Sequence, residues 1–309
     1  MAMGKQGDAE GIRRSLIEDF IPQSLPDTAS IEAKVTGENF PVAGRFLPKS
    51  TRQHLLAIYG FARFADDIGD EAQGDRLVML DWLEEELERA VACSASHPLL
   101  VRLGETIRYL QLPTAPFHQL IEANRQDQAV RRYDTYEDLL GYCKLSAAPV
   151  GRLVLEVFGV ATPARIAASD QVCAGLQIVE HLQDLKEDFA RGRVYMPQED
   201  LERFGCTEED LGRAAAGAGL RRAVHFEAVR ARRLLASSRG LCRGLPWRAR
   251  AAVAGFASGG MAALDAMEAA GYDVLQRSCR PRAWRVALHA GACLLAAASA
   301  SNQEAAPCS

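Results

Sequence analysis

Hydrophobic residues recur at helical spacing along most of the 309-residue chain. Leu80, Leu83 and Leu87 lie three and four residues apart, the spacing that places side chains on one face of an α-helix. The same spacing recurs in two further runs: Leu99, Leu103, Ile107 and Leu110, and Val150, Leu153, Val154 and Val157. Two-residue alternation, which is typical of β-strands, is nearly absent, and prolines separate the apolar runs. The pattern predicts an all-α protein.

The chain reads as one helical domain with two appendages. No segment rich in serine, glycine or proline divides it into compositionally different halves, and no repeat period is visible. We expect an N-terminal extension over residues 1–36, the helical domain over residues 37–280, and a C-terminal helix and tail over residues 281–309.

The most apolar stretch lies near the C-terminus. Val286–Ala300 is 15 residues long, whereas a membrane span needs about 20 strongly apolar residues. We therefore expect a final core helix here. The alternative is a helix that lies on a membrane surface, because Arg282, Trp284 and Arg285 suit an interfacial position.

Four carboxylates cluster within six residues, at Asp66, Asp67, Asp70 and Glu71. On a helix Asp66 and Asp70 share a face, with Arg63 one turn earlier, and like charges at that spacing repel. The neighbouring positions are apolar: Ile58, Phe61, Phe64, Ala65 and Ile68. A mostly buried helix whose acids face a cavity explains this pattern, and a solvated acidic turn is the alternative. Carboxylate oxygens suit a hard cation, with Mg²⁺ the usual choice beside a phosphate ester.

A second acidic line follows later in the chain. Glu180, Asp184 and Asp188 are spaced four residues apart, and Gln177 lies one turn earlier. On one continuous helix these side chains form a polar stripe. The positions between them are apolar: Ile178, Val179, Leu182 and Leu185. His181 adjoins the stripe. We interpret it as structural, and the alternatives are a proton acceptor or a hydrogen-bond partner of Asp184.

The two acidic segments together predict a function. Two acidic helices in a helical domain can face each other across a central cavity and bridge several divalent ions to a diphosphate. The alternative is a chance pairing of two charged segments. Because each aspartate pair lies inside an apolar helix, we favour the functional interpretation.

The charge of the chain limits its possible partners, and its cysteines indicate its redox compartment. Lysine and arginine total 36 against 40 aspartates and glutamates, so the formal net charge is -4 and nucleic acid is an unsuitable partner. The eight cysteines lack metal-binding spacing and indicate buried thiols in a reducing cytoplasm. The arginine clusters Arg221–Arg222 and Arg230–Arg233 are expected to form solvated faces without a function.

These segments resemble the squalene and phytoene synthase family, whose members join two prenyl chains head to head. The resemblance covers residues 37–280 and rests on blocks in a fixed order. The blocks are Phe46–Pro48, Ile58–Asp70, Tyr142–Gly151, Gln177–Asp188, Arg191–Pro197 and Gly271–Leu275. Within the family, Asn39–Val42, Glu180–Gln183 and Gly259–Gly260 are most similar to the bacterial hydroxysqualene synthases of hopanoid biosynthesis. The resemblance implies an isoprenoid-synthase-type helical bundle around a central cavity.

The resemblance also implies which residues carry the chemistry. It implies that Mg²⁺ is coordinated by Asp66, Asp70, Asp184 and Asp188, with Asp67, Glu71 and Glu180 on a metal or beside one. It places six residues near the diphosphate: Tyr59, Arg63, Gln177, Arg191, Arg193 and Tyr195. Tyr142, a catalytic candidate, and Phe40 are expected to line the prenyl cavity, where aromatic faces offset the charge of a carbocation. For Phe40 taken by itself, plain core packing is the interpretation we favour.

The implied reaction begins with loss of pyrophosphate. Mg²⁺ and arginine stabilise the departing group, so no nucleophilic side chain is needed. We expect an enzyme that ionises presqualene diphosphate and lets water capture the cation as hydroxysqualene. The alternatives are condensation of two farnesyl or geranylgeranyl diphosphates to presqualene diphosphate, squalene or phytoene, and a non-catalytic assembly factor. Expected partners are a prenyl diphosphate, a membrane surface in peripheral contact, and other hopanoid-pathway enzymes.

Three positions depart from the family pattern. Glu180 stands where relatives commonly have a metal-binding asparagine, and Gln183 stands where many have arginine. Gly260 replaces the tyrosine of squalene-forming and phytoene-forming members, and we expect the space there to admit water. These departures favour water capture over condensation.

Overall fold

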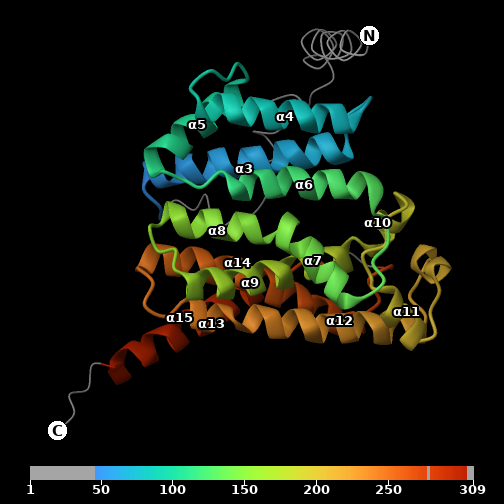
Figure 1. Cartoon of the computed structure of the whole chain (residues 1–309). Helices are drawn as coiled ribbons and strands as arrows, with labels where there is room; N and C mark the ends of the chain where they lie inside the picture. The colour runs from blue at the N-terminus through green and yellow to red at the C-terminus, as the bar shows by residue number, and fades with distance from the viewer. Residues whose placement is uncertain (1–45, 277–278, 305–309) are drawn as a thin grey trace, which may run out of the picture. The chain divides into compact units, whose positions relative to one another are not determined.

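The structure, a computed structural model, describes residues 46–276 and 279–304, with side chains described as far as Leu295. Helices account for all the regular secondary structure in these residues, and Arg132 and Val194 form an isolated parallel bridge (Figure 1). The all-α prediction is confirmed. The helices are α3 (Lys49–Asp70), α4 (Arg76–Val91), α5 (Pro98–Leu110), α6 (Ala115–Ala129), α7 (Tyr136–Ser146), α8 (Ala148–Val157), α9 (Pro163–Gln183), α10 (Leu185–Ala190), α11 (Gln198–Arg203), the 3₁₀ helix η2 (Glu208–Gly212), α12 (Ala218–Ala236), α13 (Ser238–Leu241), α14 (Trp247–Ala269) and α15 (Ala283–Glu304).

The described chain divides into two compact units. The first unit contains residues 53–129, and the second contains residues 46–52 and 130–304. The boundary predicted at residue 36 lies outside the described residues. The boundary predicted at residue 280 precedes α15, which packs on α13 and α14 within the second unit.

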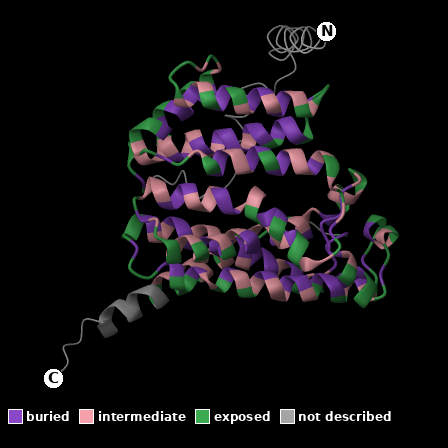
Figure 2. Ribbon diagram, in the orientation of Figure 1, coloured by how far each residue is buried: buried purple, intermediate pink, exposed green. Residues whose placement is uncertain are grey.

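Aromatic residues form the core of the first unit. Phe61 on α3 meets Phe117 on α6 edge to face with ring centroids 5.3 Å apart, and Phe64 meets Trp82 on α4 in the same way at 6.2 Å. The apolar residues that flank the acidic cluster of α3 are fully or almost fully buried (Figure 2). Burial of the apolar residues around the acids is therefore confirmed, although ten of the 22 residues of α3 are buried rather than most of them. Burial of these side chains fixes the rotation of α3 about its axis.

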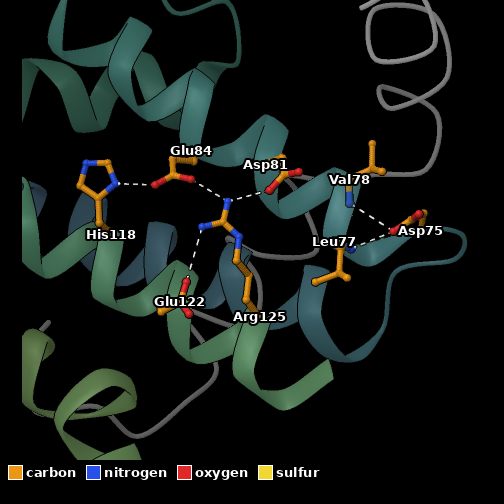
Figure 3. A network of polar contacts seen from close by, with 8 residues as sticks. All are labelled: Asp75, Leu77, Val78, Asp81, Glu84, His118, Glu122 and Arg125. Atoms are coloured by element: carbon orange, nitrogen blue, oxygen red, sulfur yellow. Dashed lines mark hydrogen bonds and ion pairs between the residues drawn. The ribbon is translucent and has the colours of Figure 1, made fainter. Parts of the chain in front are cut away.

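The chain turns sharply after α3. Asp75 accepts hydrogen bonds from the backbone nitrogens of Leu77 and Val78 and so caps the start of α4 (Figure 3). Arg76 reaches back and donates to the carbonyl oxygens of Gly69 and Asp70, each over 2.9 Å. Carbonyls at a helix end lack partners within the helix. This arginine therefore holds the end of α3, where the acids lie, in one conformation.

A polar network joins α4 to α6 on the first unit. Arg125 pairs with Asp81 at 2.8 Å, Glu84 at 2.6 Å and Glu122 at 3.7 Å, while His118 contacts Glu84 at 3.0 Å (Figure 3). The hydrogen bond from Arg125 holds the pKa of the Glu84 carboxyl below its usual value. The network fixes the position of α6 against α4.

Helix α9 lies at the centre of the second unit and packs against α7, α8, α12, α13 and α14. Small residues allow this close packing. A Cβ atom on Gly175 would lie 3.0 Å from Leu235 Cγ and 3.1 Å from the Ala231 carbonyl oxygen, so a side chain there would require α12 to shift by a few tenths of an ångström.

The arginines of α12 are not merely solvated, contrary to the sequence prediction. Arg230 pairs with two buried acids, Asp200 and Glu227, and its guanidinium lies over the ring of Tyr136 at 4.1 Å. Arg221 pairs with Asp273 at 2.7 Å and Arg232 with Asp265 at 3.0 Å. Arg222 and Arg233 are exposed, as predicted. The sequence of the arginine cluster does not show which of its arginines form ion pairs with acids in distant segments.

Helix α15 packs on α14 through polar contacts at its first turns. Asp265 on α14 contacts both Arg285 and His289 at 2.8 Å, and their hydrogen bonds, with that of Arg232, lower the pKa of Asp265 to about 2 against the effect of its burial. No helix in the described part of the chain is both long and apolar enough to cross a membrane.

The described cysteines are free thiols. Five are buried, as predicted: Cys143, Cys206, Cys242, Cys279 and Cys293. Cys93 is exposed, contrary to the prediction, because it follows the end of α4 in a tight turn with a φ of 62°.

Candidate active site

The first acidic cluster lies in the last turn of α3 and just beyond it. Asp66, Asp70 and Glu71 are exposed to solvent, whereas Asp67 is buried. The Asp67 carboxylate lies 3.5 Å from Nε of Arg63, one turn earlier on the same helix. The cluster therefore contains three accessible carboxylates and one that holds an arginine.

This position is electrostatically unfavourable without a cation. The C-terminal end of a helix carries partial negative charge, which destabilises carboxylates in the last turn. Helix α3 has no basic residue within its last turn, and the guanidinium of Arg76, which donates to the Gly69 and Asp70 carbonyl oxygens, offsets only part of this negative charge. A divalent cation with oxygen ligands would relieve this repulsion, so the residues present fit Mg²⁺.

Asp66 is held by a neighbouring helix. Asn124 on α6 donates from its amide nitrogen to Asp66 Oδ1 over 3.1 Å. Although Asp66 is accessible to solvent, the protein atoms around it limit its hydration and raise the pKa of its carboxyl to about 6. Repulsion from Asp70 adds to this increase, while the Asn124 hydrogen bond and the charge of Arg63 oppose it. The Asn124 hydrogen bond therefore orients the Asp66 carboxylate, while its surroundings disfavour its negative charge.

The sequence reasoning missed the residues of α6. Asn124 and Asp127 are 4% and 6% exposed, and Gln128 donates to the Gly69 carbonyl oxygen over 3.0 Å. These polar residues follow the apolar Phe117, Leu120 and Ile121 at helical spacing. The criterion that identified the other two segments, polar residues on an apolar helix, would have found this one.

The second acidic line is not on one continuous helix, contrary to the prediction. Helix α9 ends at Gln183 and α10 begins at Leu185, with Asp184 between them at φ -99° and ψ 9°. Backbone hydrogen bonds still connect Asp184 to Glu180 at 2.9 Å and Asp188 to Asp184 at 2.8 Å. The break is therefore a local change in direction. Partial burial and repulsion from Glu187 raise the pKa of Asp184.

His181 lies beside Asp188 rather than Asp184. Its Nδ1 lies 3.9 Å from Asp188 Oδ2, and its Nε2 lies 3.3 Å from the amide nitrogen of Gln177. Burial, together with the charge of Arg193, lowers the pKa of His181 to about 3, so the imidazole is neutral at neutral pH. Since the Gln177 amide donates to Nε2, we assign the proton to Nδ1, on the side of Asp188.

The segment Arg191–Pro197 folds back onto this helix junction. The backbone nitrogens of Arg191 and Arg193 donate to the Asp188 carbonyl oxygen at 3.1 and 2.9 Å. Arg193 is buried and Arg191 is exposed. The ring of Tyr195 stacks on His181 with centroids 3.8 Å apart. The predicted residues Asp188, Arg193 and Tyr195 are thus brought together.

Further aromatic rings complete this part of the second unit. Tyr142 lies 5.5 Å from Tyr195 and 6.1 Å from His181, measured between ring centroids, and Tyr133 lies 5.5 Å from Tyr142. Tyr142 is 5% exposed. The sequence reasoning missed Tyr133, which follows α6 in an irregular segment without a periodic pattern.

The remaining predicted residues have diverse positions. Tyr59 is half-buried on α3, Gln177 is half-buried on α9, and Glu180 is exposed. Phe40 lies outside the described residues. Among the residues that the structure describes, no group of three or more histidines, cysteines or acids is placed to hold a metal. A Mg²⁺ ion that shares its ligands with a diphosphate needs only one or two carboxylates, so this finding fits such a site.

Comparison with known proteins identifies the family. The family model described as squalene/phytoene synthase matches residues 33–286. The chain belongs to the squalene/phytoene synthase family. Members of this family act on prenyl diphosphates.

Individual relatives agree with this assignment. The hydroxysqualene synthase of Zymomonas mobilis is 36% identical over 206 residues, which cover 66% of this chain and 69% of the relative. The hydroxysqualene synthase of Rhodopseudomonas palustris is 38% identical over 208 residues, covering 66% and 70%. The crystal structure of the squalene synthase HpnC from Alicyclobacillus acidocaldarius superposes with a TM-score of 0.74 at 41% identity and covers 82% of this chain and 98% of that one. The predicted isoprenoid-synthase-type helical fold is confirmed.

Two positions that depart from the family pattern have specific surroundings. Gln183 donates from its amide nitrogen to the Cys279 carbonyl oxygen over 2.9 Å, which ties the end of α9 to the segment before α15. A Cβ atom on Gly260 would lie 2.8 Å from Leu176 Cδ2 and 3.0 Å from Leu235 Cδ1. The expectation that Gly260 leaves space for water is therefore wrong, because two leucine side chains occupy that volume.

Proposed function

We propose that this squalene/phytoene synthase family member is a Mg²⁺-dependent enzyme that ionises presqualene diphosphate, releases pyrophosphate and adds water to give hydroxysqualene. The observation that carries the proposal is the accessible acidic cluster at the end of α3, where three carboxylates lie at the negative end of a helix dipole. The similarity to two hydroxysqualene synthases supports the choice of reaction.

The chain's residues would bind the diphosphate through metal and through direct contacts. Asp66, Asp70 and Glu71 from α3, and Glu180, Asp184 and Asp188 from the α9–α10 junction, would hold Mg²⁺. Bound Mg²⁺ would supply positive charge to the phosphate oxygens and so stabilise the leaving group. Asp67 would act by orienting Arg63, since its buried carboxylate already lies beside that guanidinium.

Ionisation would need no nucleophile on the protein. The bond between carbon and the diphosphate oxygen breaks, its electron pair leaves with pyrophosphate, and a carbocation remains. Arg63, Arg191 and Arg193 would stabilise the charge that develops on the leaving oxygens. The backbone of Arg191 and Arg193 is fixed to Asp188, which places both residues at the α9–α10 junction.

Aromatic residues would then stabilise the cation. The rings of Tyr142 and Tyr195 lie 5.5 Å apart, and their faces would offset positive charge. Water supplies its oxygen to the cation and loses one proton, which yields the alcohol. His181 would be a poor base for this proton, because its Nε2 accepts from Gln177 in our assignment and burial lowers its pKa to about 3.

Head-to-head condensation of two prenyl diphosphates is the second candidate function. The similarity to the squalene synthase HpnC of Alicyclobacillus acidocaldarius, at 41% identity, favours it. Gly260 does not oppose condensation by admitting water, since Leu176 and Leu235 fill that space.

Product analysis separates the two functions. Purified protein with Mg²⁺ is given presqualene diphosphate or farnesyl diphosphate separately; pyrophosphate is measured and the extracts are analysed by mass spectrometry. We expect an alcohol from presqualene diphosphate and no product from farnesyl diphosphate. A condensed C30 product from farnesyl diphosphate would support the prenyltransferase, and no release from either substrate by folded protein would support a non-catalytic relative.

A further inference from the structure

A groove of about 370 Å³ lies along α12 in the second unit. Its α12 residues begin at Arg222 and end at Arg233, and the positions between them recur at helical spacing on one face. Phe204, which follows α11, completes the lining. We call this feature the α12 groove. None of the predicted site residues lines it, so it is a feature apart from the candidate active site.

The middle of the α12 groove is apolar. Phe226 and Val229 lie there one turn apart on the helix, and Phe204 meets Phe226 with ring centroids 5.5 Å apart. Two guanidinium groups lie over the Phe226 ring, that of Arg203 at 4.5 Å and that of Arg230 at 4.3 Å. The three apolar side chains are half-buried. They therefore leave apolar surface that a second molecule could cover.

Arginines without acidic partners stand at both ends of the α12 groove. Arg222 and Arg233 are exposed, and neither forms an ion pair within the described part of the chain. Arg203 is likewise exposed and has no acidic partner there. Arg230 differs, because two buried acids balance its charge. Since no acid is among the described residues that line the groove, it is locally positive although the formal net charge of the chain is -4.

The shape of the α12 groove favours an elongated partner. Sites for small molecules enclose most of their ligand, whereas every side chain that lines this groove is half-buried or exposed. Arg222 and Arg233 are eleven residues apart, which is about 16 Å along a helix. An extended segment advances about 3.3 Å per residue, so two acids five positions apart span the same distance. A segment with acids at both ends and apolar residues between them matches the groove in charge and length.

We propose that the α12 groove binds an acidic segment of another protein, whose carboxylates contact Arg222 and Arg233 and whose apolar residues cover Phe226 and Val229. A planar guanidinium pairs with a carboxylate through two parallel hydrogen bonds, which fixes the direction and register of the segment. The apolar contact lies at the centre and the charges at the rim, as in protein interfaces generally. This binding does not depend on which reaction the acidic clusters catalyse.

Fluorescence anisotropy with a labelled synthetic peptide tests this binding on the full-length protein. The peptide Asp-Glu-Ala-Leu-Phe-Ala-Asp-Glu places acids five positions apart on either side of a leucine and a phenylalanine. We expect saturable binding of one peptide per chain, which weakens as salt is added. The double variant Arg222→Gln with Arg233→Gln should bind about tenfold more weakly or worse, because both ends of the groove lose a charge-assisted hydrogen bond.

A second peptide separates the apolar contact from the charge. Serine replaces its leucine and its phenylalanine, so its net charge is unchanged. It should bind the wild type about tenfold more weakly or worse, because it buries no large apolar side chain against the middle of the groove.

Two exposed arginines outside the groove provide the matched control. Arg239 and Arg243 lie in the same unit and do not line the groove. Arg239→Gln with Arg243→Gln changes the net charge by the same amount and should leave peptide binding unchanged. Thermal unfolding of both double variants should match the wild type, since all four altered side chains are exposed.

The absence of saturable binding between the wild type and the first peptide would overturn the proposal. An equal loss of binding in the control variant would also overturn it, because the peptide would then respond only to the overall charge of the protein. A third contrary result is equal binding of the serine peptide together with displacement of both peptides by inorganic phosphate. That result would make the groove a site for small anions.

Discussion

Asn124 on α6 donates a hydrogen bond to Asp66 on α3 over 3.1 Å. The contact is possible because Gly69, one turn after Asp66, lacks a side chain: a Cβ atom there would lie 2.2 Å from Asn124 Oδ1 and 3.2 Å from Asn124 Cβ. Asn124 is buried and also donates to the Leu120 carbonyl oxygen. A glycine on one helix thus allows an amide on the next to orient a carboxylate of the candidate site.

The first prediction concerns this amide. Asn124→Ala removes the donor, and Gly69→Ala displaces it, so both should raise the Mg²⁺ concentration needed for half-maximal pyrophosphate release by about 10- to 100-fold. The measurement is pyrophosphate release as a function of Mg²⁺ at fixed substrate.

The control for Gly69→Ala lies on the same helix. A Cβ atom on Gly60 would meet Leu99 Cδ1 at 3.5 Å, an ordinary contact. Gly60→Ala should leave the Mg²⁺ requirement unchanged. An unaltered requirement in both Asn124→Ala and Gly69→Ala would show that the amide does not support metal binding.

The second prediction concerns repulsion at the end of α3. Asp70→Asn removes one of the charges that raise the pKa of Asp66 and one that opposes the helix dipole. We expect the free energy of unfolding without metal to rise by about 0.5 kcal/mol, while activity falls strongly. Urea unfolding measures the first effect. Wild-type stability should increase further with Mg²⁺ and pyrophosphate, and the variant should gain less.

An acid away from the helix end is the control for Asp70→Asn. Glu105 is exposed on α5 in the same unit. Glu105→Gln should give neither the gain in stability nor the loss of activity. A loss of stability in Asp70→Asn would contradict the view that the cluster is strained without a cation.

The third prediction follows from two buried acids that share one cation. Asp200 and Glu227 are each 1% exposed, and Arg230 Nη1 lies 2.5 Å from a carboxylate oxygen of both. Burial, with the hydrogen bond to Asp200, raises the pKa of Glu227 to about 8 against the opposing charge of Arg230. Folded protein therefore retains a proton on this pair that the unfolded chain releases above its usual pKa of 4.5.

The sign of the pH effect follows from that proton. The contribution of Glu227 to stability is complete below pH 4.5, falls as the pH rises toward 8, and is lost above it, with a slope of up to about 1.4 kcal/mol per pH unit. Glu227→Gln should remove this slope from the free energy of unfolding measured in urea between these values. Glu202→Gln, at an exposed acid on α11, should retain it. Parallel pH profiles for wild type and Glu227→Gln would contradict the shared proton.

Hydrophobic spacing was sufficient to locate the two acidic segments, because periodicity depends only on neighbours along the chain. The buried run around Phe61 and Phe64 follows from it directly, whereas Asp66 and Asp70, which were expected to face an interior cavity, are exposed. The break at Asp184 could not be predicted, since no proline or glycine marks it and the backbone hydrogen bonds continue across it.

Contacts between distant segments set the limit of the sequence reasoning. The partner of His181 is Asp188 because Arg191–Pro197 folds back onto the helix junction, and no local pattern encodes that return. In the same way Arg230 is next to exposed arginines in the sequence but pairs with acids from α11 and its own helix. The missing side chain of Gly260 indicated a space, yet whether neighbours fill it depends on α9 and α12.

The last prediction tests this filled volume. Replacing an exposed helical glycine by alanine stabilises a protein by about 0.5–1 kcal/mol. Gly259→Ala should show such a gain, because a Cβ atom there meets nothing within 4 Å. Gly260→Ala should show no gain, since Leu176 and the fully buried Leu235 must move, and Gly260→Tyr should lose about 1–3 kcal/mol or more.

Urea unfolding gives these values, and mass spectrometry of the products shows whether the fraction of alcohol changes. If water reached the cation through this position, Gly260→Ala would keep the stability gain of Gly259→Ala and shift the product toward hydrocarbon. An unchanged product with the gain absent would instead assign water access to another part of the cavity.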